Sequence, residues 1–125
     1  MWAPSGSTTM NERHPGAGDI FIVDLDPIRG SEQAGRRPVL VISEDEMNSR
    51  SRRMIVCPIT GNMAVWTTKV PLPEGLLTRG MVLTDQVRSI DKDARILRYV
   101  ETAAPQFVLD VRSYVGRLLG LQLAP

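Results

Sequence analysis

The chain has 125 residues, a formal net charge of +1 and 42% hydrophobic residues, which fits one globular domain. This composition excludes a collagen-like, coiled-coil or wholly disordered protein, and the balanced charge by itself points to no class of partner. The single cysteine, Cys57, allows no disulfide within the chain and fits a reducing cytoplasm, and no apolar run approaches the roughly 20 residues that span a bilayer.

The chain opens with a segment that lacks any apolar period. Residues 1–17 are rich in Ser, Thr, Pro and Gly, which predicts a mobile tail before one domain over residues 18–125. The β-rich run at residues 20–25 predicts a strand that ends at the turn signal Asp26-Pro27. A polar loop follows, and the wholly apolar residues 39–42 predict a short central strand.

The middle of the chain continues with short elements. Residues 45–49 fit one helical turn, and residues 54–60 predict a second buried strand, in which Pro58 indicates an edge or a bend. Residues 65–72 alternate in polarity, which predicts a strand with one solvated face. Residues 81–84 and 87–90 predict one bent strand or a pair of short strands.

The end of the chain has the spacing of a helix. Pro105 suits a first turn, and Gly120 suits the position after a last turn. The apolar residues between them recur at helical spacing, namely Phe107, Val108, Val111, Val115, Leu118 and Leu119. Short strands with one C-terminal helix predict a mainly β fold of the α+β class, built as a small curved sheet or partial barrel. Such a barrel holds little ligand, so we expect a surface site formed by loops.

The polar loop at residues 30–38 is the first candidate site. Its two glycines permit close approach to a ligand, and Glu32 is a candidate general base. Arg36 and Arg37 supply N–H donors for a phosphodiester. The alternative is a solvated hairpin connection whose charges pair with each other. Thr60, at the end of a predicted strand, offers a hydroxyl to a phosphate oxygen or else satisfies the following turn.

A second candidate follows the strand at residues 81–84. Gln86 and Arg88 would share one side of an extended segment, where they could contact base edges or a backbone phosphate. The alternative is a hydrogen-bond network at a sheet edge. The carboxylate pairs Asp24/Asp26 and Asp91/Asp93 are a weak signal for a metal, and we expect no metal site. His14 is the only histidine, so no Ser–His triad is available.

Four strings stand in an order and spacing that closely resemble the MazF/PemK (Kid) toxin family. They are GDIFIVDLDP at residues 18–27, GSEQAGRRP at residues 30–38, VCPIT at residues 56–60 and DQVRSID at residues 85–91. The resemblance covers residues 18–119. It implies an SH3-like barrel of the kind shared by CcdB and MazF, with a C-terminal helix.

The same resemblance implies the toxin of a bacterial type II toxin–antitoxin pair. Family members are sequence-specific endoribonucleases that cleave single-stranded RNA, chiefly mRNA, and need no metal or other cofactor. They are homodimers with RNA grooves near the dimer interface. The expected partner is a MazE-like antitoxin with an acidic, largely disordered C-terminal segment, and no membrane is involved.

The resemblance also implies roles for single residues. Arg37 matches the family's catalytic Arg, Thr60 its catalytic Thr, and Glu32 an acidic residue implicated in some members. PemK-like members carry an Arg two residues before Asp85, where this chain has Leu83, and this departure favours the MazF-type assignment to Arg37 and Thr60. The residues expected to bind RNA are Arg29, Gln33, Arg36, Gln86, Arg88 and Ser89.

The implied reaction uses the nucleophile that RNA itself carries. Attack of a 2′-hydroxyl on the neighbouring phosphate gives a 2′,3′-cyclic phosphate and a 5′-hydroxyl end, and the enzyme must stabilise charge and manage two protons. One alternative is a CcdB-like toxin that binds gyrase without cutting RNA. Another is an inactive homologue with a structural role.

Overall fold

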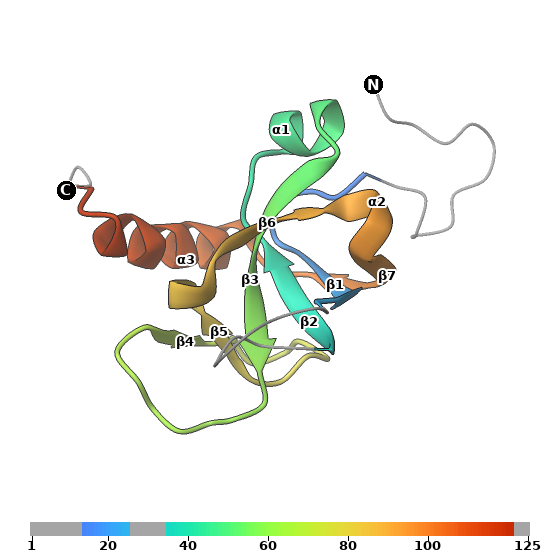
Figure 1. The fold of residues 1–125 in the computed structure, drawn as a ribbon. Helices are drawn as coiled ribbons and strands as arrows, with labels where there is room; N and C mark the ends of the chain where they lie inside the picture. The colour runs from blue at the N-terminus through green and yellow to red at the C-terminus, as the bar shows by residue number, and fades with distance from the viewer. Residues whose placement is uncertain (1–13, 26–34, 122–125) are drawn as a thin grey trace.

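The computed structural model describes residues 14–25 and 35–121 and places their strands in one seven-stranded antiparallel sheet (Figure 1). The strands are β1 (Asp19–Asp24), β2 (Arg36–Val41), β3 (Arg53–Thr60), β4 (Lys69–Pro71), β5 (Met81–Leu83), β6 (Arg88–Asp91) and β7 (Ile96–Thr102). Neighbours follow the order β4-β5-β3-β2-β1-β7, and β6 pairs with β3 as well. The helices are α1 (Asp45–Arg50), the single 3-10 turn η1 (Thr84–Gln86), α2 (Lys92–Arg95) and α3 (Pro105–Leu118).

The central strands are buried on both faces, which explains why their sequences are runs of apolar residues without alternation. Leu40 points to the face that α3 covers, whereas Val39 and Val41 point to the opposite face. The core on the α3 side contains Ile20, Leu40, Ile42, Cys57, Ile59, Val82, Phe107, Val111 and Val115. The other core contains Phe21, Val23, Leu25, Val39, Val41, Met54, Val56 and Ile90.

The helix α3 has the bounds and the caps that its sequence predicts. Pro105 is its first residue, and Phe107, Val111 and Val115 bury one face against the sheet. Gly120 adopts a φ of 78° after the last turn, and the N–H of Leu121 donates to the carbonyl of Gly116 at 2.9 Å. This left-handed termination is the geometry that favours glycine at that position.

The strand β3 changes partner along its length. Its first half pairs with β6, where Met54 lies opposite Ile90, and its end pairs with β5, where Ile59 lies opposite Val82. The turn η1 takes up the extra residues between the two partners. The predicted pair of short strands is therefore correct, and Pro58 lies where β3 changes partner in the middle of the sheet, not at a sheet edge.

The strand predicted for residues 65–72 is wrong for most of its length. Only Lys69–Pro71 form β4, because the facing strand β5 is itself three residues long and offers no partner further out. The preceding loop bends back instead. The Lys69 ammonium donates to the carbonyls of Asn62 at 3.3 Å and Ala64 at 3.0 Å, which holds the loop in a compact form.

The predicted mainly β fold with a C-terminal helix is confirmed, as an open sheet and not a closed barrel. The short helix α2 and the strand β7 were not predicted. The last two residues of the predicted tail, Gly16 and Ala17, donate backbone hydrogen bonds to the carboxylates of Asp19 and Asp45 at 2.8 and 2.9 Å. Within residues 14–25 and 35–121, no helix is both long and apolar enough to cross a bilayer.

Candidate active site

The strands that carry two predicted catalytic residues, β2 and β3, pair with each other. Their ladder ends where Val39 lies opposite Pro58, and Arg37 and Thr60 each lie two residues beyond that last pair. Opposed residues of antiparallel strands project from the same face, so both side chains belong to the face away from α3. Arg37 is half-buried and Thr60 is buried. In Figure 1, β2 begins and β3 ends at the same end of the molecule.

Thr60 is fixed by its surroundings. Its Oγ1 accepts a hydrogen bond from the N–H of Asn62 at 3.1 Å, which leaves its O–H as a donor for an incoming oxygen. Gly80 packs directly against its backbone, because a Cβ atom at Gly80 would lie 2.3 Å from the Thr60 carbonyl oxygen. The hydroxyl therefore sits on a backbone that cannot shift easily.

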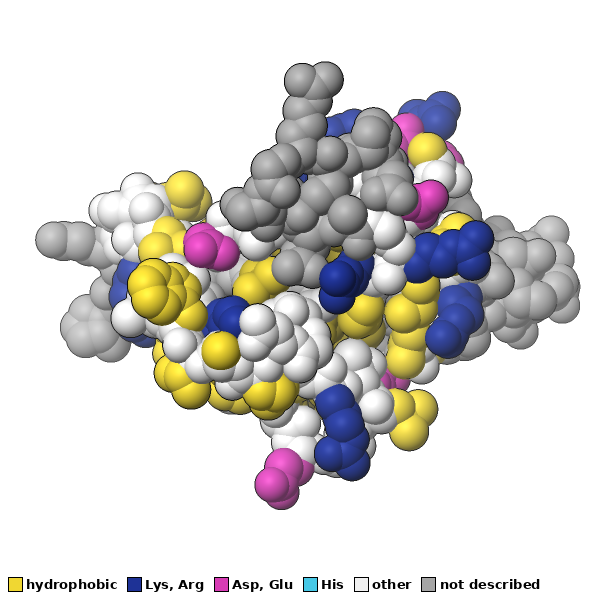
Figure 2. All heavy atoms as spheres, turned by 60° about the horizontal axis from the view of Figure 1, so that its bottom comes forward, with side chains coloured by type: hydrophobic (Ala, Val, Ile, Leu, Met, Phe, Trp, Pro, Cys, Tyr) yellow, Lys and Arg dark blue, Asp and Glu magenta, His cyan; other side chains and the backbone are white. Residues whose placement is uncertain are grey.

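The loop at residues 61–68 follows Thr60 at this end of the molecule and carries exposed apolar side chains. The backbone N–H of Ala64 donates to the Asn62 side-chain oxygen at 3.0 Å, which adds to the two carbonyl contacts from Lys69. Met63, Val65 and Trp66 project from the loop with 59%, 87% and 63% of their surfaces exposed. Figure 2 shows Lys and Arg side chains spread among hydrophobic ones over this end.

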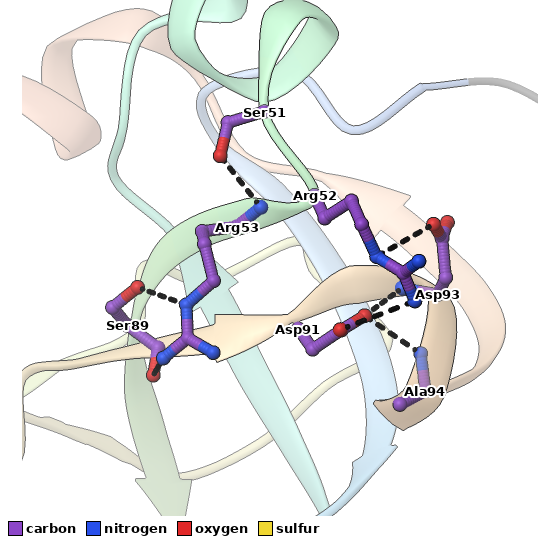
Figure 3. A network of polar contacts seen from close by, with 7 residues as sticks. All are labelled: Ser51, Arg52, Arg53, Ser89, Asp91, Asp93 and Ala94. Carbon is purple, nitrogen blue, oxygen red and sulfur yellow. Dashed lines mark hydrogen bonds and ion pairs between the residues drawn. The ribbon is translucent and has the colours of Figure 1, made fainter.

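A second positively charged site lies at β6, which we call the arginine pocket. It has a volume of about 330 Å³ and is lined by Asp24, Arg53, Arg88, Ser89, Ile90, Asp91, Ala94 and Arg95. The Arg53 guanidinium donates to the hydroxyl and to the carbonyl of Ser89, at 3.0 Å each (Figure 3). Arg95 donates to the Asp24 carbonyl at 3.1 Å. The Arg88 guanidinium makes no hydrogen bond or ion pair with any residue that the structure describes.

One of the two carboxylates in this pocket, that of Asp91, is already engaged. The Asp91 carboxylate caps α2 by accepting from the N–H groups of Asp93 and Ala94 at 2.9 and 3.0 Å, and it lies 3.4 Å from Arg52 (Figure 3). The Ala94 hydrogen bond is the largest cause that lowers the pKa of Asp91, followed by the charge of Arg52. The lining holds three arginines against the two aspartates, Asp24 and Asp91, so the arginine pocket keeps an excess of positive charge.

The structure corrects one detail of the predicted site. Gln86 ends the turn η1, whereas Arg88 begins β6, so the two do not share one side of an extended segment. The physical reason is that β3 pairs first with β6 and then with β5, so the residues between these two strands, including Gln86, turn away from the sheet as η1. Ser89 is exposed, but its hydroxyl accepts from Arg53 and so orients that side chain.

Burial rules out a catalytic role for some residues, and other residues named in the sequence analysis are not described by the structure. Cys57 is buried on the α3 side, and burial, assisted by the charge of Asp85, raises the pKa of its thiol to about 12, so it cannot act as a thiolate. Leu83 is buried in β5. Among residues 14–25 and 35–121, no three His, Cys, Asp or Glu side chains cluster as metal ligands would. Arg29, Glu32 and Gln33 lie outside the described residues.

Two arginines of the pocket were missed by the sequence analysis. Arg53 belongs to the basic run Arg50, Arg52, Arg53, and its sequence gives no reason to single it out. Arg95 lies in α2, a helix of four residues that has no apolar period. Arg36, which was predicted, is exposed at the start of β2, opposite Asp24.

Comparison with known proteins gives one consistent family. The family model described as the PemK-like, MazF-like toxin of type II toxin–antitoxin systems matches residues 16–119. The Escherichia coli K12 endoribonuclease toxin MazF is 35% identical over 106 residues, which cover 85% of this chain and 95% of that protein. A Staphylococcus saprophyticus endoribonuclease MazF is 34% identical over 109 residues, covering 83% and 90%.

Solved structures agree with this assignment. A crystal structure of MazF from Deinococcus radiodurans superposes with a TM-score of 0.80 at 34% identity, covering 87% of this chain and 99% of that one. A MazE–MazF structure from the same organism gives a TM-score of 0.75 at 31% identity, covering 88% and 99%. The chain therefore belongs to the PemK-like, MazF-like family of type II toxins.

Proposed function

We propose that this chain is the toxin of a type II toxin–antitoxin pair and cleaves single-stranded RNA, chiefly mRNA, at specific sequences without a metal ion. The pairing of β2 with β3, whose ladder ends two residues from both Arg37 and Thr60, is the observation that carries the proposal. A guanidinium and a hydroxyl side by side can hold the two non-bridging oxygens of one phosphodiester. The names of the curated relatives point to the same activity.

In this reaction the 2′-hydroxyl attacks the adjacent phosphorus, and the bond from phosphorus to the 5′-oxygen of the next nucleotide breaks. The products are a 2′,3′-cyclic phosphate and a 5′-hydroxyl end. Arg37 stabilises the charge that grows on the phosphate oxygens, and Thr60 donates a hydrogen bond to one of them. Arg37 stays protonated throughout, because its pKa is above about 12. Glu32 is the base candidate on sequence grounds alone.

The arginine pocket supplies affinity for the RNA backbone. Arg88 lies opposite Val56, four residues before Thr60 along β3, which is roughly 13 Å at the rise of a strand. A phosphate held by Arg88, Arg53 and Arg95 would belong to the same RNA strand, a few nucleotides from the cleaved bond. Arg36, exposed beside Arg37, is a further backbone contact, and Gln86 is a candidate base contact.

The partners follow from the family. We propose a homodimer and a MazE-like antitoxin whose acidic, disordered C-terminal segment lies over the arginine-lined surface and blocks RNA. The neighbouring MazE–MazF structures from Deinococcus radiodurans support this pairing. The proposed place of action is the bacterial cytoplasm, where mRNA is available, and the proposed domain spans residues 18–125 after a tail of residues 1–17.

The experiment compares Arg37→Ala with its neighbour Arg36→Ala. Loss of one electrostatic donor at the reacting phosphate should lower kcat by about 10²–10³-fold in Arg37→Ala. Arg36→Ala should keep kcat and raise KM, because an exposed backbone contact contributes binding only. Near-normal kcat in a folded Arg37→Ala variant would remove this residue from the reaction.

Two substrate controls test the chemistry. A 2′-deoxyribose on the 5′ side of the cut should abolish cleavage, since it removes the nucleophile, whereas EDTA should leave the rate unchanged. The comparisons do not favour a CcdB-like toxin. Trapped gyrase complexes with intact RNA would support that alternative, and the absence of both effects would indicate an inactive homologue.

A further inference from the structure

The side chain of Lys69 supports the loop that follows Thr60. Its ammonium donates to the carbonyl of Asn62 at 3.3 Å and to the carbonyl of Ala64 at 3.0 Å. A hydrogen bond from a charged donor is roughly twice as strong as one between neutral groups. Two such bonds from one side chain therefore hold the first residues of this loop against the start of β4.

The backbone of Lys69 is itself fixed relative to Thr60. Lys69 begins β4 and lies opposite Leu83 in β5. The strand β5 also pairs with the end of β3, where Met81 lies opposite Thr60. Because the three strands form one ladder, the ammonium of Lys69 reaches the loop from a base that is joined to the strand of Thr60.

Asn62 is the residue through which this support reaches the Thr60 hydroxyl. Its N–H donates to Thr60 Oγ1 at 3.1 Å, and its carbonyl accepts from Lys69. Its side-chain oxygen accepts from the N–H of Ala64 at 3.0 Å. Gly61 alone separates Asn62 from Thr60, and glycine has more backbone freedom than any other residue. The contacts of Asn62, and not the chain that leads to it, therefore determine where its N–H lies.

The N–H of Asn62 sets the direction in which the Thr60 hydroxyl can donate. It occupies one lone pair of Oγ1, so the hydroxyl proton must point elsewhere and is left for a phosphate oxygen. The hydroxyl makes no other hydrogen bond within residues 14–25 and 35–121. A shift of Asn62 would remove the contact that orients this donor, and with it the preorganisation that stabilises a transition state.

We propose that Lys69 is a positioning residue for the cleavage reaction, because it holds Asn62 where the N–H of Asn62 orients the Thr60 hydroxyl. The proposal rests on the proposed function, since it needs Thr60 to act on the phosphate. An ammonium has three N–H donors, and two carbonyls already use the ammonium of Lys69, which disfavours a direct contact with the RNA phosphate.

The test is a double-mutant cycle on Lys69 and Thr60. Lys69→Met keeps a long side chain without donors, and it should lower kcat about ten- to hundredfold at unchanged KM, the loss for a shift of about 1 Å. Thr60→Val keeps the shape of the side chain and removes the hydroxyl, which should lower kcat about 10²–10³-fold. Adding Lys69→Met to Thr60→Val should cause no further loss of kcat, because the hydroxyl that Lys69 positions is already gone.

Three further variants separate positioning from charge and from folding. Lys69→Arg can still donate to both carbonyls and should recover most of kcat. Arg79→Met removes one positive charge from an exposed position in the loop between β4 and β5, and it should keep the kcat and KM of the wild type. If Lys69→Met does not fold, Lys69→Gln, which keeps a neutral donor, takes its place in the same cycle. Melting temperatures report the folding of each variant.

Each other outcome overturns the proposal in a distinguishable way. If Lys69→Met lowers kcat equally with and without the Thr60 hydroxyl, Lys69 acts independently of that hydroxyl, although the proposed function stands. A raised KM, with a slope of log affinity against log salt reduced by about 0.7, would make Lys69 a phosphate contact. A lower melting temperature with normal kcat would leave Lys69 a structural role only. If Thr60→Val cuts RNA as fast as the wild type, or the wild type cuts none, the proposed function fails and the positioning role fails with it.

Discussion

The contact between Gly80 and Thr60 predicts a graded response to adding one methyl group at three glycines. Gly80 combines a φ of 137° with a Cβ position 2.3 Å from the Thr60 carbonyl oxygen. Gly75 has a φ of 96° but no atom within 4 Å of its Cβ position. Gly61 has no positive φ and equally open space. The three variants to alanine therefore separate backbone strain from steric overlap.

The magnitudes follow from these geometries. Gly61→Ala should raise the free energy of unfolding by about 0.4–1 kcal/mol, because alanine restricts the unfolded chain. Gly75→Ala should lower the free energy of unfolding by about 1–2 kcal/mol, which is the penalty of a left-handed backbone for an L-residue. Gly80→Ala combines backbone strain, about 1–3 kcal/mol, with steric overlap against backbone atoms, about 1–3 kcal/mol. Together they should lower the free energy of unfolding by about 2–6 kcal/mol.

The assay is urea unfolding of the three variants, with the m-value checked for constancy so that midpoint shifts report stability. A displacement of about 1 Å at Thr60 should also lower the cleavage rate of Gly80→Ala, by about a hundredfold. Gly75→Ala should leave that rate unchanged. A Gly80→Ala protein no less stable than Gly75→Ala would refute the view that the backbone at Thr60 is tightly enclosed.

Three further predictions concern charge and reactivity. Burial by itself would raise the pKa of Glu101. The hydrogen bonds from Thr78 and from the N–H of Leu77 together outweigh burial and lower this pKa below its ordinary value of 4.5. This carboxylate therefore stabilises the fold above that pH, and the stability is lost as the pH falls through the lowered pKa. Glu101→Gln should lose less melting temperature between pH 7 and pH 3 than the wild type, and equal losses would contradict this. The Cys57 thiol, with a pKa of about 12, should resist iodoacetamide at pH 8 in the native protein and react fully in urea, whereas fast native labelling would contradict its burial. Arg53→Ala and Arg95→Ala should each reduce the slope of log affinity for single-stranded RNA against log salt by about 0.7, the amount for one phosphate contact, and Arg50→Ala, outside the pocket, should leave the slope unchanged.

The strands and the helix that sequence predicts best are those whose side chains meet the core on a regular period. The runs that became β1, β2 and β3 are buried on both faces, so their apolar character is visible without any partner. The helix α3 adds caps at both ends, which fix its bounds from local chemistry alone. In each case the local signal and the tertiary packing agree.

Prediction failed where the partner strand decides the structure. No residue of β7 is fully buried, and its pairing with β1 is interrupted by two register shifts, so it has neither an apolar run nor a strict alternation. The alternating residues before Lys69 read as a strand, but within residues 14–25 and 35–121 no strand pairs with them. A segment forms a strand only when a neighbouring strand pairs with it, and the sequence of one segment does not show whether such a neighbour is present.

The residues of the candidate site also differ in how well sequence predicts them. Arg37 and Thr60 stand in recognisable strings, and they lie on two well-predicted strands that pair with each other. The contact of Glu101 with Thr78 joins residues 23 positions apart at the two ends of the sheet order, and it arises only because the sheet curls. Arg95 reaches the arginine pocket through a four-residue helix. Such convergence depends on long-range geometry that composition and spacing do not contain.

β3 fixes the spacing between two places that are proposed to bind RNA phosphates. Its end carries Thr60, and its first half pairs with β6, which carries Arg88, so a buried strand joins the two places. Substitutions in the loop at residues 61–68, which Lys69 holds in a compact form, should therefore leave the spacing between these two places unchanged.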